Sequence, residues 1–234
     1  NCVDLQDAES FERVYNWIEP LNIGYIGRIA VTKGMENLLQ ACRELKAKQI
    51  PFIVKLAGAE EVKDSFLPLF DSYLGHQFIY AGIVSGEKKN IFLKSLDVFV
   101  LPSYFEGLPM SLLECMSYGA VPVTTNVGSI GDVVEDCKNG LFIKMKDTDS
   151  IIEALTNLNN DREMLSRLGN EARATIFQNF NPHKYIQNLN IIYGRNVRAE
   201  MNVAPSRKAK VFVVSEDAKI RDIFENGNQD YSNK

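Results

Sequence analysis

Short apolar runs alternate with longer amphipathic stretches along the chain from Ile23 onward. The runs are rich in β-branched and aromatic residues and span only a few positions, which is typical of buried strands. Six strands are predicted in this way, at Ile23–Ile29, Phe52–Ala57, Phe78–Ala81, Val98–Leu101, Val121–Thr125 and Leu141–Ile143. Strands that alternate with helices in this manner favour an α/β fold, in which helices cover both faces of a parallel sheet.

The amphipathic stretches have the periodicity of helices. Between the first two strands, apolar residues recur at helical spacing, at Met35, Leu38, Leu39, Cys42 and Leu45. After the last strand, the pattern predicts three consecutive helices, at about Ser150–Leu158, Asp161–Gln178 and Pro182–Tyr193. Ser150 and Glu153 have the spacing of a capping box, so we expect the first of these helices to begin at Ser150.

Changes of pattern divide the chain into three parts. Residues 1–21 form an amino-terminal lead-in, residues 22–194 form the α/β domain, and residues 195–234 form a linker and tail of unknown role. The tail contains one candidate strand at Val211–Val214 and one candidate short helix at Asp217–Phe224. These two elements carry too little apolar surface for a core of their own.

Composition and charge narrow the class of protein. Hydrophobic residues make up 45% and charged residues 24% of the 234 positions, which excludes collagen, low-complexity disorder and coiled coil. The 26 basic and 30 acidic residues leave a net charge of −4, so we expect no nucleic-acid partner. We also expect no transmembrane segment, because the apolar runs are far shorter than the ~18 residues that a span needs. The chain starts at Asn1 without a signal segment, as a piece of a longer protein would.

The cysteines give no sign of a metal or redox site. They lie far apart and form no C-x-x-C pair, at Cys2, Cys42, Cys115 and Cys137. Cys42 and Cys115 fall on apolar helical positions, so we expect them to be buried free thiols. Free thiols are typical of a reducing compartment, and we therefore expect a cytoplasmic location.

Two loops that follow predicted strands carry candidate chemistry, because ligands of parallel α/β sheets bind at the carboxyl ends of the strands. The loop Gly27–Gly34 contains Arg28 and Lys33, which could bind phosphate or could equally be solvated surface charges. The loop Pro102–Pro109 leads into a helix whose free N–H groups can hold an anion.

The second loop also contains two features of its own. Gly107 leaves room for a ligand to approach the backbone, and Glu106 lies beside it. Glu114, in the helix that follows, is either a solvated carboxylate or an acceptor that points at a ligand. In another loop, Ile83 and Val84 could pack against a flat apolar ring or could be part of the core.

Taken in chain order, these motifs resemble those of one family. They run Gly27-Arg28…Lys33-Gly34, Ala57-Gly58, Ala81-Gly82, Pro102-Ser103…Glu106-Gly107-Leu108-Pro109…Glu114, Gly119-Ala120-Val121-Pro122-Val123 and Asn139-Gly140-Leu141. The series is similar to the carboxyl-terminal half of the GT-B glycosyltransferases of the retaining family 4 type (glycosyl transferases group 1), over about residues 22–194. The resemblance implies a Rossmann-like sheet that is one half of a GT-B architecture.

In that family, this half binds the nucleotide-sugar donor, whose base can be that of UDP, GDP or ADP. The resemblance places Arg28 and Lys33 on the diphosphate and Glu106 on the donor sugar, and it implies catalytic roles for these three residues. It places Glu114 on the ribose hydroxyls. The remaining donor contacts that it implies are those of Gly107, Leu108, Pro109 and Met110 with the distal phosphate and sugar, and those of Ile83 and Val84 with the base.

The chain departs from the family pattern in two respects. The family commonly has Gly-Gly-x-Pro-Glu where this chain has Gly128-Ser129-Ile130-Gly131-Asp132, which affects the geometry of that loop. In addition, we expect the amino-terminal half, which contacts the acceptor, to be missing from this chain, because residues 1–21 are too few to replace it. We therefore expect binding to survive in the 234-residue chain and transfer to be nearly lost.

The resulting hypothesis is the donor-binding half of a hexosyltransferase that acts without a cofactor or a metal. Its acceptor would be a saccharide or a lipid-linked molecule in polysaccharide or glycoconjugate synthesis, with peripheral membrane contact as an option. The sequence leaves open whether Glu106 acts as a covalent nucleophile or only stabilises the sugar. Two alternatives also stay open, namely a protein similar to the nucleotide-sugar epimerases of GT-B fold and a non-catalytic nucleotide-binding module.

Overall fold

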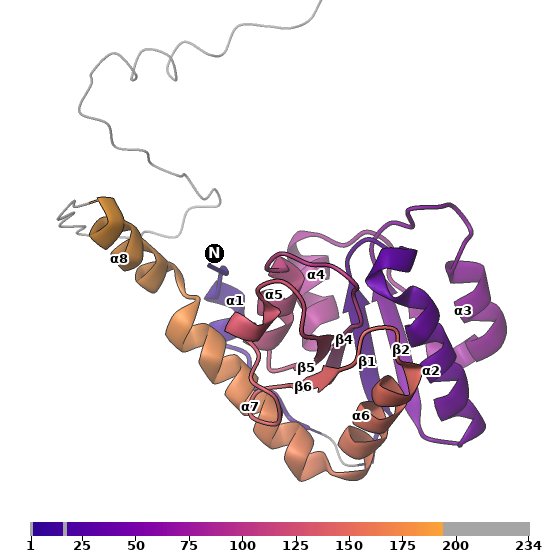
Figure 1. The fold of residues 1–234 in the computed structure, drawn as a ribbon. Helices are drawn as coiled ribbons and strands as arrows, with labels where there is room; N and C mark the ends of the chain where they lie inside the picture. The colour runs from indigo at the N-terminus through magenta and orange to yellow at the C-terminus, as the bar shows by residue number, and fades with distance from the viewer. Residues whose placement is uncertain (1, 16–17, 194–234) are drawn as a thin grey trace, which may run out of the picture. The chain divides into compact units, whose positions relative to one another are not determined.

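A computed structural model of the chain describes residues 2–15 and 18–193, and six parallel strands form its central sheet (Figure 1). The strands are β1 (Leu21–Ile26), β2 (Phe52–Ala57), β3 (Phe78–Tyr80), β4 (Val98–Leu101), β5 (Val121–Thr125) and β6 (Leu141–Ile143). All six predicted strands are present, although β1 begins at Leu21 and ends at Ile26, three residues before the predicted end. Their order in the sheet is β3-β2-β1-β4-β5-β6.

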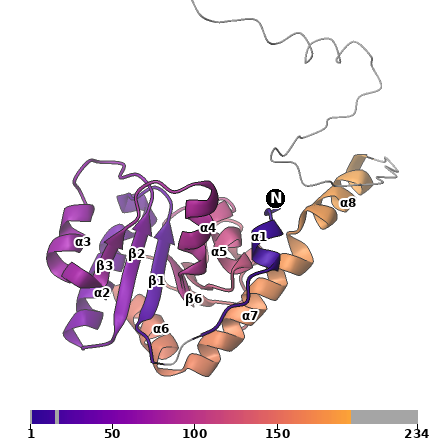
Figure 2. The same ribbon diagram turned by 180° about the vertical axis from the view of Figure 1, so that it is seen from behind.

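Helices cover both faces of the sheet, as predicted (Figures 1 and 2). One face carries α2, α3 and α6, and the other carries α4, α5 and α7. The α-helices are α1 (Gln6–Glu9), α2 (Met35–Ala47), α3 (Leu67–Leu74), α4 (Gly86–Lys94), α5 (Met110–Ser117), α6 (Thr148–Asn160), α7 (Arg162–Asn179) and α8 (Pro182–Tyr193). Short 3₁₀ turns lie at η1 (Val31–Lys33), η2 (Gly75–Gln77) and η3 (Ile130–Asp132). The α/β class inferred from the sequence is therefore confirmed.

The start of α6 differs from the prediction. The helix begins at Thr148, and its N-cap is Asp147, whose side chain accepts a hydrogen bond of 2.9 Å from the Ser150 backbone N–H. The capping box at Ser150 is therefore wrong, because the Asp147 carboxylate already occupies the capping position. α7 begins at Arg162, one residue after the predicted start at Asp161, and Asp161 is its N-cap because its side chain accepts a hydrogen bond from the Met164 N–H.

The core is apolar on both faces of the sheet and includes the two predicted thiols. Cys42 and Cys115 are free and fully buried, and burial raises the pKa of both thiols. This location confirms the prediction for these two cysteines. The candidate strand at Val211–Val214 and the candidate helix at Asp217–Phe224 lie outside the described residues.

The segment before β1 packs onto the same core. Val3, Leu5 and Ala8 are buried in it. Arg13 fastens the segment, because its Nε donates to the Tyr118 carbonyl at 2.7 Å and its Nη1 lies 3.5 Å from the Asp97 carboxylate. The Arg13 Nη2 also donates to the carbonyls of Leu93 and Lys94, and only 6% of the side chain is exposed. The segment is therefore an integral part of the packing.

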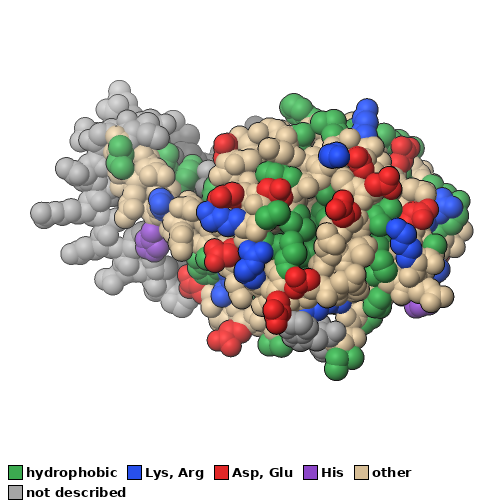
Figure 3. All heavy atoms as spheres, turned by 60° about the horizontal axis from the view of Figure 1, so that its bottom comes forward, with side chains coloured by type: hydrophobic (Ala, Val, Ile, Leu, Met, Phe, Trp, Pro, Cys, Tyr) green, Lys and Arg blue, Asp and Glu red, His purple; other side chains and the backbone are tan. Residues whose placement is uncertain are grey.

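The surface carries basic and acidic side chains side by side. In the face shown in Figure 3, Lys and Arg side chains are interspersed with Asp and Glu side chains. That face of the described residues therefore presents no extended cationic surface of the kind that holds a nucleic-acid backbone. Within residues 2–15 and 18–193, none of the helices has both the length and the hydrophobicity that crossing a bilayer requires.

Glu60 supports the loop between β2 and α3. Its carboxylate accepts hydrogen bonds from the backbone N–H groups of Asp64, Phe66 and Leu67 at 2.7 to 2.9 Å. Burial acts to raise the pKa of Glu60, but these backbone hydrogen bonds outweigh it and lower the pKa below the ordinary value of 4.5. The stabilisation is therefore complete above that value and is lost as the pH falls through the lower, folded-state pKa.

We expect Glu60→Gln to lower the free energy of unfolding by about 1 kcal/mol at pH 7, the usual cost of losing a helix cap. The difference from the parent should shrink as the pH falls below 4.5, because the protonated glutamic acid resembles glutamine. Urea unfolding across this pH range measures it. Glu61→Gln, in an exposed ion pair, is the matched control and should have little effect. A difference that stays constant with pH would contradict the prediction.

Candidate functional site

The strand order reverses its direction between β1 and β4, which is where open α/β sheets bind ligands. The loops that follow β1, β4 and β5 meet there. The Tyr104 N–H donates to the Thr32 carbonyl at 2.9 Å, and the Ser129 N–H donates to the Gly107 carbonyl at 3.0 Å. The structure therefore brings the two cation- and carboxylate-bearing loops together, and the loop 126–132 borders them.

Glycine makes this close approach of the loops possible. Gly34 has a φ of +72°, and a Cβ there would overlap the carbonyl of Pro102. Gly128 has a φ of +59°, and a Cβ there would overlap the carbonyl of Glu106. Both positions need a residue that tolerates positive φ and has no side chain, so the contact between these loops depends on glycine.

Lys33 and Glu106 form the central ion pair of the site. The Lys33 Nζ lies 2.7 Å from the Glu106 Oε1, and the two side chains are 18% and 11% exposed. Ser103, which is fully buried, donates from its Oγ to the same Oε1 at 2.7 Å. The Ser103 carbonyl in turn accepts from the buried Thr125 hydroxyl at 2.6 Å. These hydrogen bonds hold the Glu106 carboxylate in one orientation.

Tyr25, in β1, holds the loop Gly27–Gly34 in place. Its hydroxyl donates to the backbone carbonyl of Arg28. Burial raises the pKa of Tyr25, and the nearby Glu106 carboxylate adds to the increase. The phenol therefore remains a protonated donor at neutral pH.

Arg28 lies apart from the central pair. Its side chain is 62% exposed and its Nη1 lies 3.1 Å from the Glu61 Oε1. The two cations of the first loop thus have separate carboxylate partners, and an incoming anion would have to compete with both pairs.

The start of α5 is open. A Cβ at Gly107 would meet no atom within 4 Å, and Met110 is 40% exposed. Pro109 is the N-cap of α5, and no side chain caps the helix. The backbone between Gly107 and Met110 therefore has room for an anion beside the free N–H groups.

Glu114 lies one turn into α5 and is paired with Lys89 of α4. The Lys89 Nζ lies 2.8 Å from the Glu114 Oε1, and the side chains are 31% and 22% exposed. Ile83, in the loop before α4, is 77% exposed, and Val84 packs partly against the core. The structure therefore places Ile83 at the surface, where a ligand can reach it.

Three residues that bond to the predicted site residues were not predicted from the sequence, namely Ser103, Lys89 and Glu61. Ser103 follows a strand directly and precedes Glu106 by three positions, which is a weak local signal. Lys89 and Glu61 lie 25 and 33 residues from their partners, and no local pattern connects them.

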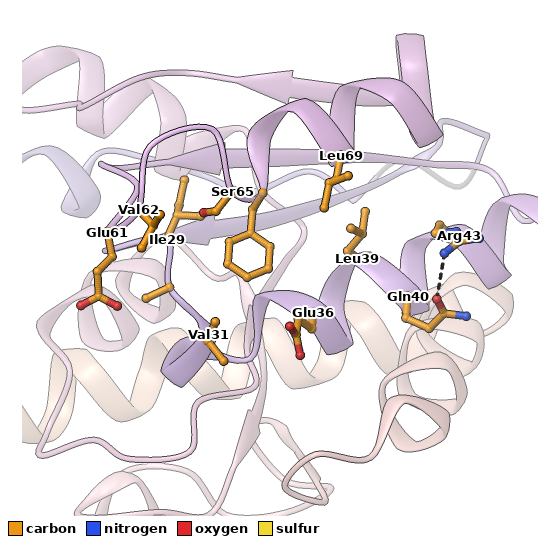
Figure 4. Close-up of a pocket in the computed structure, with 12 residues that line it drawn as sticks. Ile29, Val31, Glu36, Leu39, Gln40, Arg43, Glu61, Val62, Ser65 and Leu69 are labelled. Carbon is orange, nitrogen blue, oxygen red and sulfur yellow. Dashed lines mark hydrogen bonds between the residues drawn. The ribbon is translucent and has the colours of Figure 1, made fainter.

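Two hollows of about 360 Å³ flank the site. The first adjoins the Arg28 loop, and Figure 4 shows Leu39 and Leu69 near its middle and Glu61 at one end. The second includes Val84 together with Lys55, Lys88 and Ile91. Neither hollow is lined by Lys33, Glu106 or Glu114, so these charged residues lie outside both hollows. Among the described residues, no three His, Cys, Asp or Glu side chains are grouped so that they could hold a metal ion.

Comparisons with known proteins agree on one family. The family model described as "Glycosyl transferases group 1" matches residues 9–175. The putative colanic acid biosynthesis glycosyltransferase WcaL of Salmonella typhimurium is 28% identical over 170 residues, which cover 69% of this chain and 42% of WcaL. The chain thus spans less than half the length of curated relatives such as this one.

Solved structures share the fold. The carboxyl-terminal domain of the glycosyl transferase group 1 protein LpcC from Francisella tularensis superposes with a TM-score of 0.67 at 21% identity, covering 77% of this chain and 99% of that domain. HepE from Anabaena, in complex with UDP-glucose, superposes with a TM-score of 0.66 at 15% identity, covering 76% of this chain and 50% of HepE.

Proposed function

Because the chain belongs to the glycosyl transferases group 1 family, we propose that its residues 22–194 are the donor-binding half of a retaining glycosyltransferase. The donor is a nucleotide diphosphate sugar, and the acceptor is a saccharide or a lipid-linked molecule in polysaccharide or glycoconjugate synthesis. The name of WcaL supports this class of acceptor, and the complex of HepE with UDP-glucose supports this class of donor.

The observation that carries the proposal is the Lys33–Glu106 pair beside the open start of α5. Glycosyl transfer from a nucleotide diphosphate builds negative charge on the leaving phosphate and positive charge on the sugar. Lys33 and the N–H groups at the start of α5 would stabilise the negative charge on the phosphate, and Glu106 would stabilise the positive charge on the sugar. In this assignment, the incoming phosphate takes Lys33 from Glu106 and frees that carboxylate for the donor sugar.

The other residues complete the donor site. Arg28 is exposed and could turn from Glu61 toward the diphosphate, to which its guanidinium offers paired donors. Glu114 would accept from the ribose hydroxyls, and Ile83 and Val84 would border the base. The chain covers 42% of WcaL, and the proposal assigns only donor contacts to it.

The proposal is tested by titrating the 234-residue chain with UDP, GDP and ADP, each with and without Mg²⁺. We expect one of the three to bind with a Kd of about micromolar to millimolar, which is the range of −8 to −4 kcal/mol. UDP is the first nucleotide to test because HepE binds UDP-glucose. Isothermal calorimetry gives the affinity and the effect of the metal.

A transfer assay on the same chain, with a nucleotide-sugar donor and a saccharide acceptor, complements the binding measurement. Transfer by the chain alone should be nearly absent, because orienting an acceptor supplies about 7 to 11 kcal/mol of the lowering of the barrier. Failure to bind any of the three nucleotides would contradict the donor-site assignment. Efficient transfer by the chain alone would show that a second half is not needed.

A further inference from the structure

Lys89 connects two parts of the proposed donor site. It lies in the first turn of α4, directly after the loop that carries Ile83 and Val84, and its ammonium group bonds to Glu114 of α5 at 2.8 Å. The two residues are 25 positions apart in the chain. Their ion pair therefore connects the loop proposed to border the base with the carboxylate proposed to hold the ribose.

The pair leaves half of the carboxylate available. Lys89 bonds to Oε1 of Glu114, and the Oε2 atom accepts no hydrogen bond within the described part of the chain. The Glu114 side chain is only 22% exposed. A cation at this distance restricts the rotation of the carboxylate.

We propose that Lys89 is a positioning residue for the nucleoside part of the donor, which holds Glu114 so that its free oxygen faces the ribose hydroxyls. This inference rests on the proposed function, because it assumes that Glu114 binds ribose. Lys89 acts through Glu114 and through the spacing between α4 and α5, and it makes no contact with the diphosphate.

Lys94 is a matched control for this role. It is the last residue of the same helix and also forms an ion pair, with its Nζ 2.8 Å from the Asp7 Oδ2, and its side chain is 33% exposed, close to the 31% of Lys89. Asp7 belongs to α1, outside the proposed donor site. Replacing Lys94 removes one positive charge from α4 and leaves the Lys89–Glu114 pair in place.

The experiment compares Lys89→Met with Lys94→Met, using UDP and inorganic pyrophosphate as separate probes in calorimetry. If GDP or ADP is the nucleotide that binds the parent, it replaces UDP. We expect Lys89→Met to lower the affinity for the nucleotide about tenfold, which is the effect of losing one charge-assisted hydrogen bond. The affinity for pyrophosphate should stay unchanged. Lys94→Met should change the affinity for neither probe. Lys89→Arg, which keeps the charge, should recover most of the affinity.

A double-mutant cycle with Glu114→Gln tests the route of the effect. In the Glu114→Gln background, Lys89→Met should have little further effect, because its partner is already neutral. Thermal unfolding of each variant separates a loss of binding from a loss of folding.

The outcomes are distinct. Equal loss of nucleotide and pyrophosphate affinity would show that Lys89 acts on the phosphates, and no loss of either would show that the ion pair is irrelevant to binding. Both results overturn the inference and leave the proposed function intact. A parent chain that binds none of the three nucleotides contradicts the proposed function itself and this inference with it.

Discussion

Replacing Lys33 with methionine should weaken the binding of a nucleoside diphosphate to this chain about 10- to 100-fold. A hydrogen bond to a charged group is worth about 1.5 to 3 kcal/mol, and each 1.4 kcal/mol corresponds to a factor of ten in Kd. Lys33 is only 18% exposed, so solvent screens its charge less than that of a surface lysine. Its loss also leaves the Glu106 carboxylate unpaired beside the incoming anion, which opposes binding further.

Calorimetric titration measures this change, and Lys138→Met is the matched control. Lys138 also forms a lysine–glutamate pair, at 2.6 Å from Glu135, but the pair is exposed and precedes β6, so it lies at the opposite end of the strands from the site. Its replacement should leave the affinity unchanged.

Glu106→Gln distinguishes the roles of the two partners. It removes a negative charge near the diphosphate, so the affinity for the nucleoside diphosphate should be kept or increased, whereas the contribution of the donor sugar to binding should fall. If Lys33→Met bound nucleoside diphosphate like the parent, Lys33 would not contact the diphosphate. An equal loss with Glu106→Gln would mean that the ion pair serves the fold.

Replacing Arg13 with leucine should lower the free energy of unfolding by about 3 to 5 kcal/mol, as expected for breaking a buried ion pair. Arg13 donates to three backbone carbonyls and pairs with Asp97, so its removal leaves several buried acceptors without a partner. Burial lowers the pKa of Arg13, and Asp97 partly offsets this decrease, so the guanidinium stays charged at neutral pH.

Urea unfolding at pH 7 measures the loss of stability. Arg43→Leu is the control, because Arg43 is exposed on α2, bonds to Gln40 and stacks on Tyr73. We expect that variant to lose no more than about 1 kcal/mol. If Arg13→Leu lowered the free energy of unfolding no more than Arg43→Leu does, the packing of the lead-in segment would not depend on Arg13. The result would also show whether the residues before β1 are required for the fold of the domain.

Much of the fold could be predicted from the sequence, because strands buried on both faces must be apolar throughout. Val98–Leu101 is apolar at every position, and Val121–Thr125 is fully buried with its two threonine hydroxyls bonded to backbone carbonyls. The structure places both strands in the interior of the sheet. The amphipathic spacing between the strands likewise predicted the helices. Helix ends were less certain, since Asp147 and Ser150 are both good caps and only the backbone conformation decides which is used.

The sequence alone also located Lys33 and Glu106 in loops that follow strands, because that position depends only on the order of residues along the chain. It could not pair them, since 73 residues separate the two side chains. Their contact exists because β1 lies next to β4 in the sheet, and strand order depends on how the helices pack over the whole sheet rather than on local periodicity. The same reason applies to Lys89 and Glu114, whose helices become neighbours only in the folded domain. The sequence by itself thus determined the class of fold and the loops that carry the chemistry, and only the tertiary structure decided which charges meet.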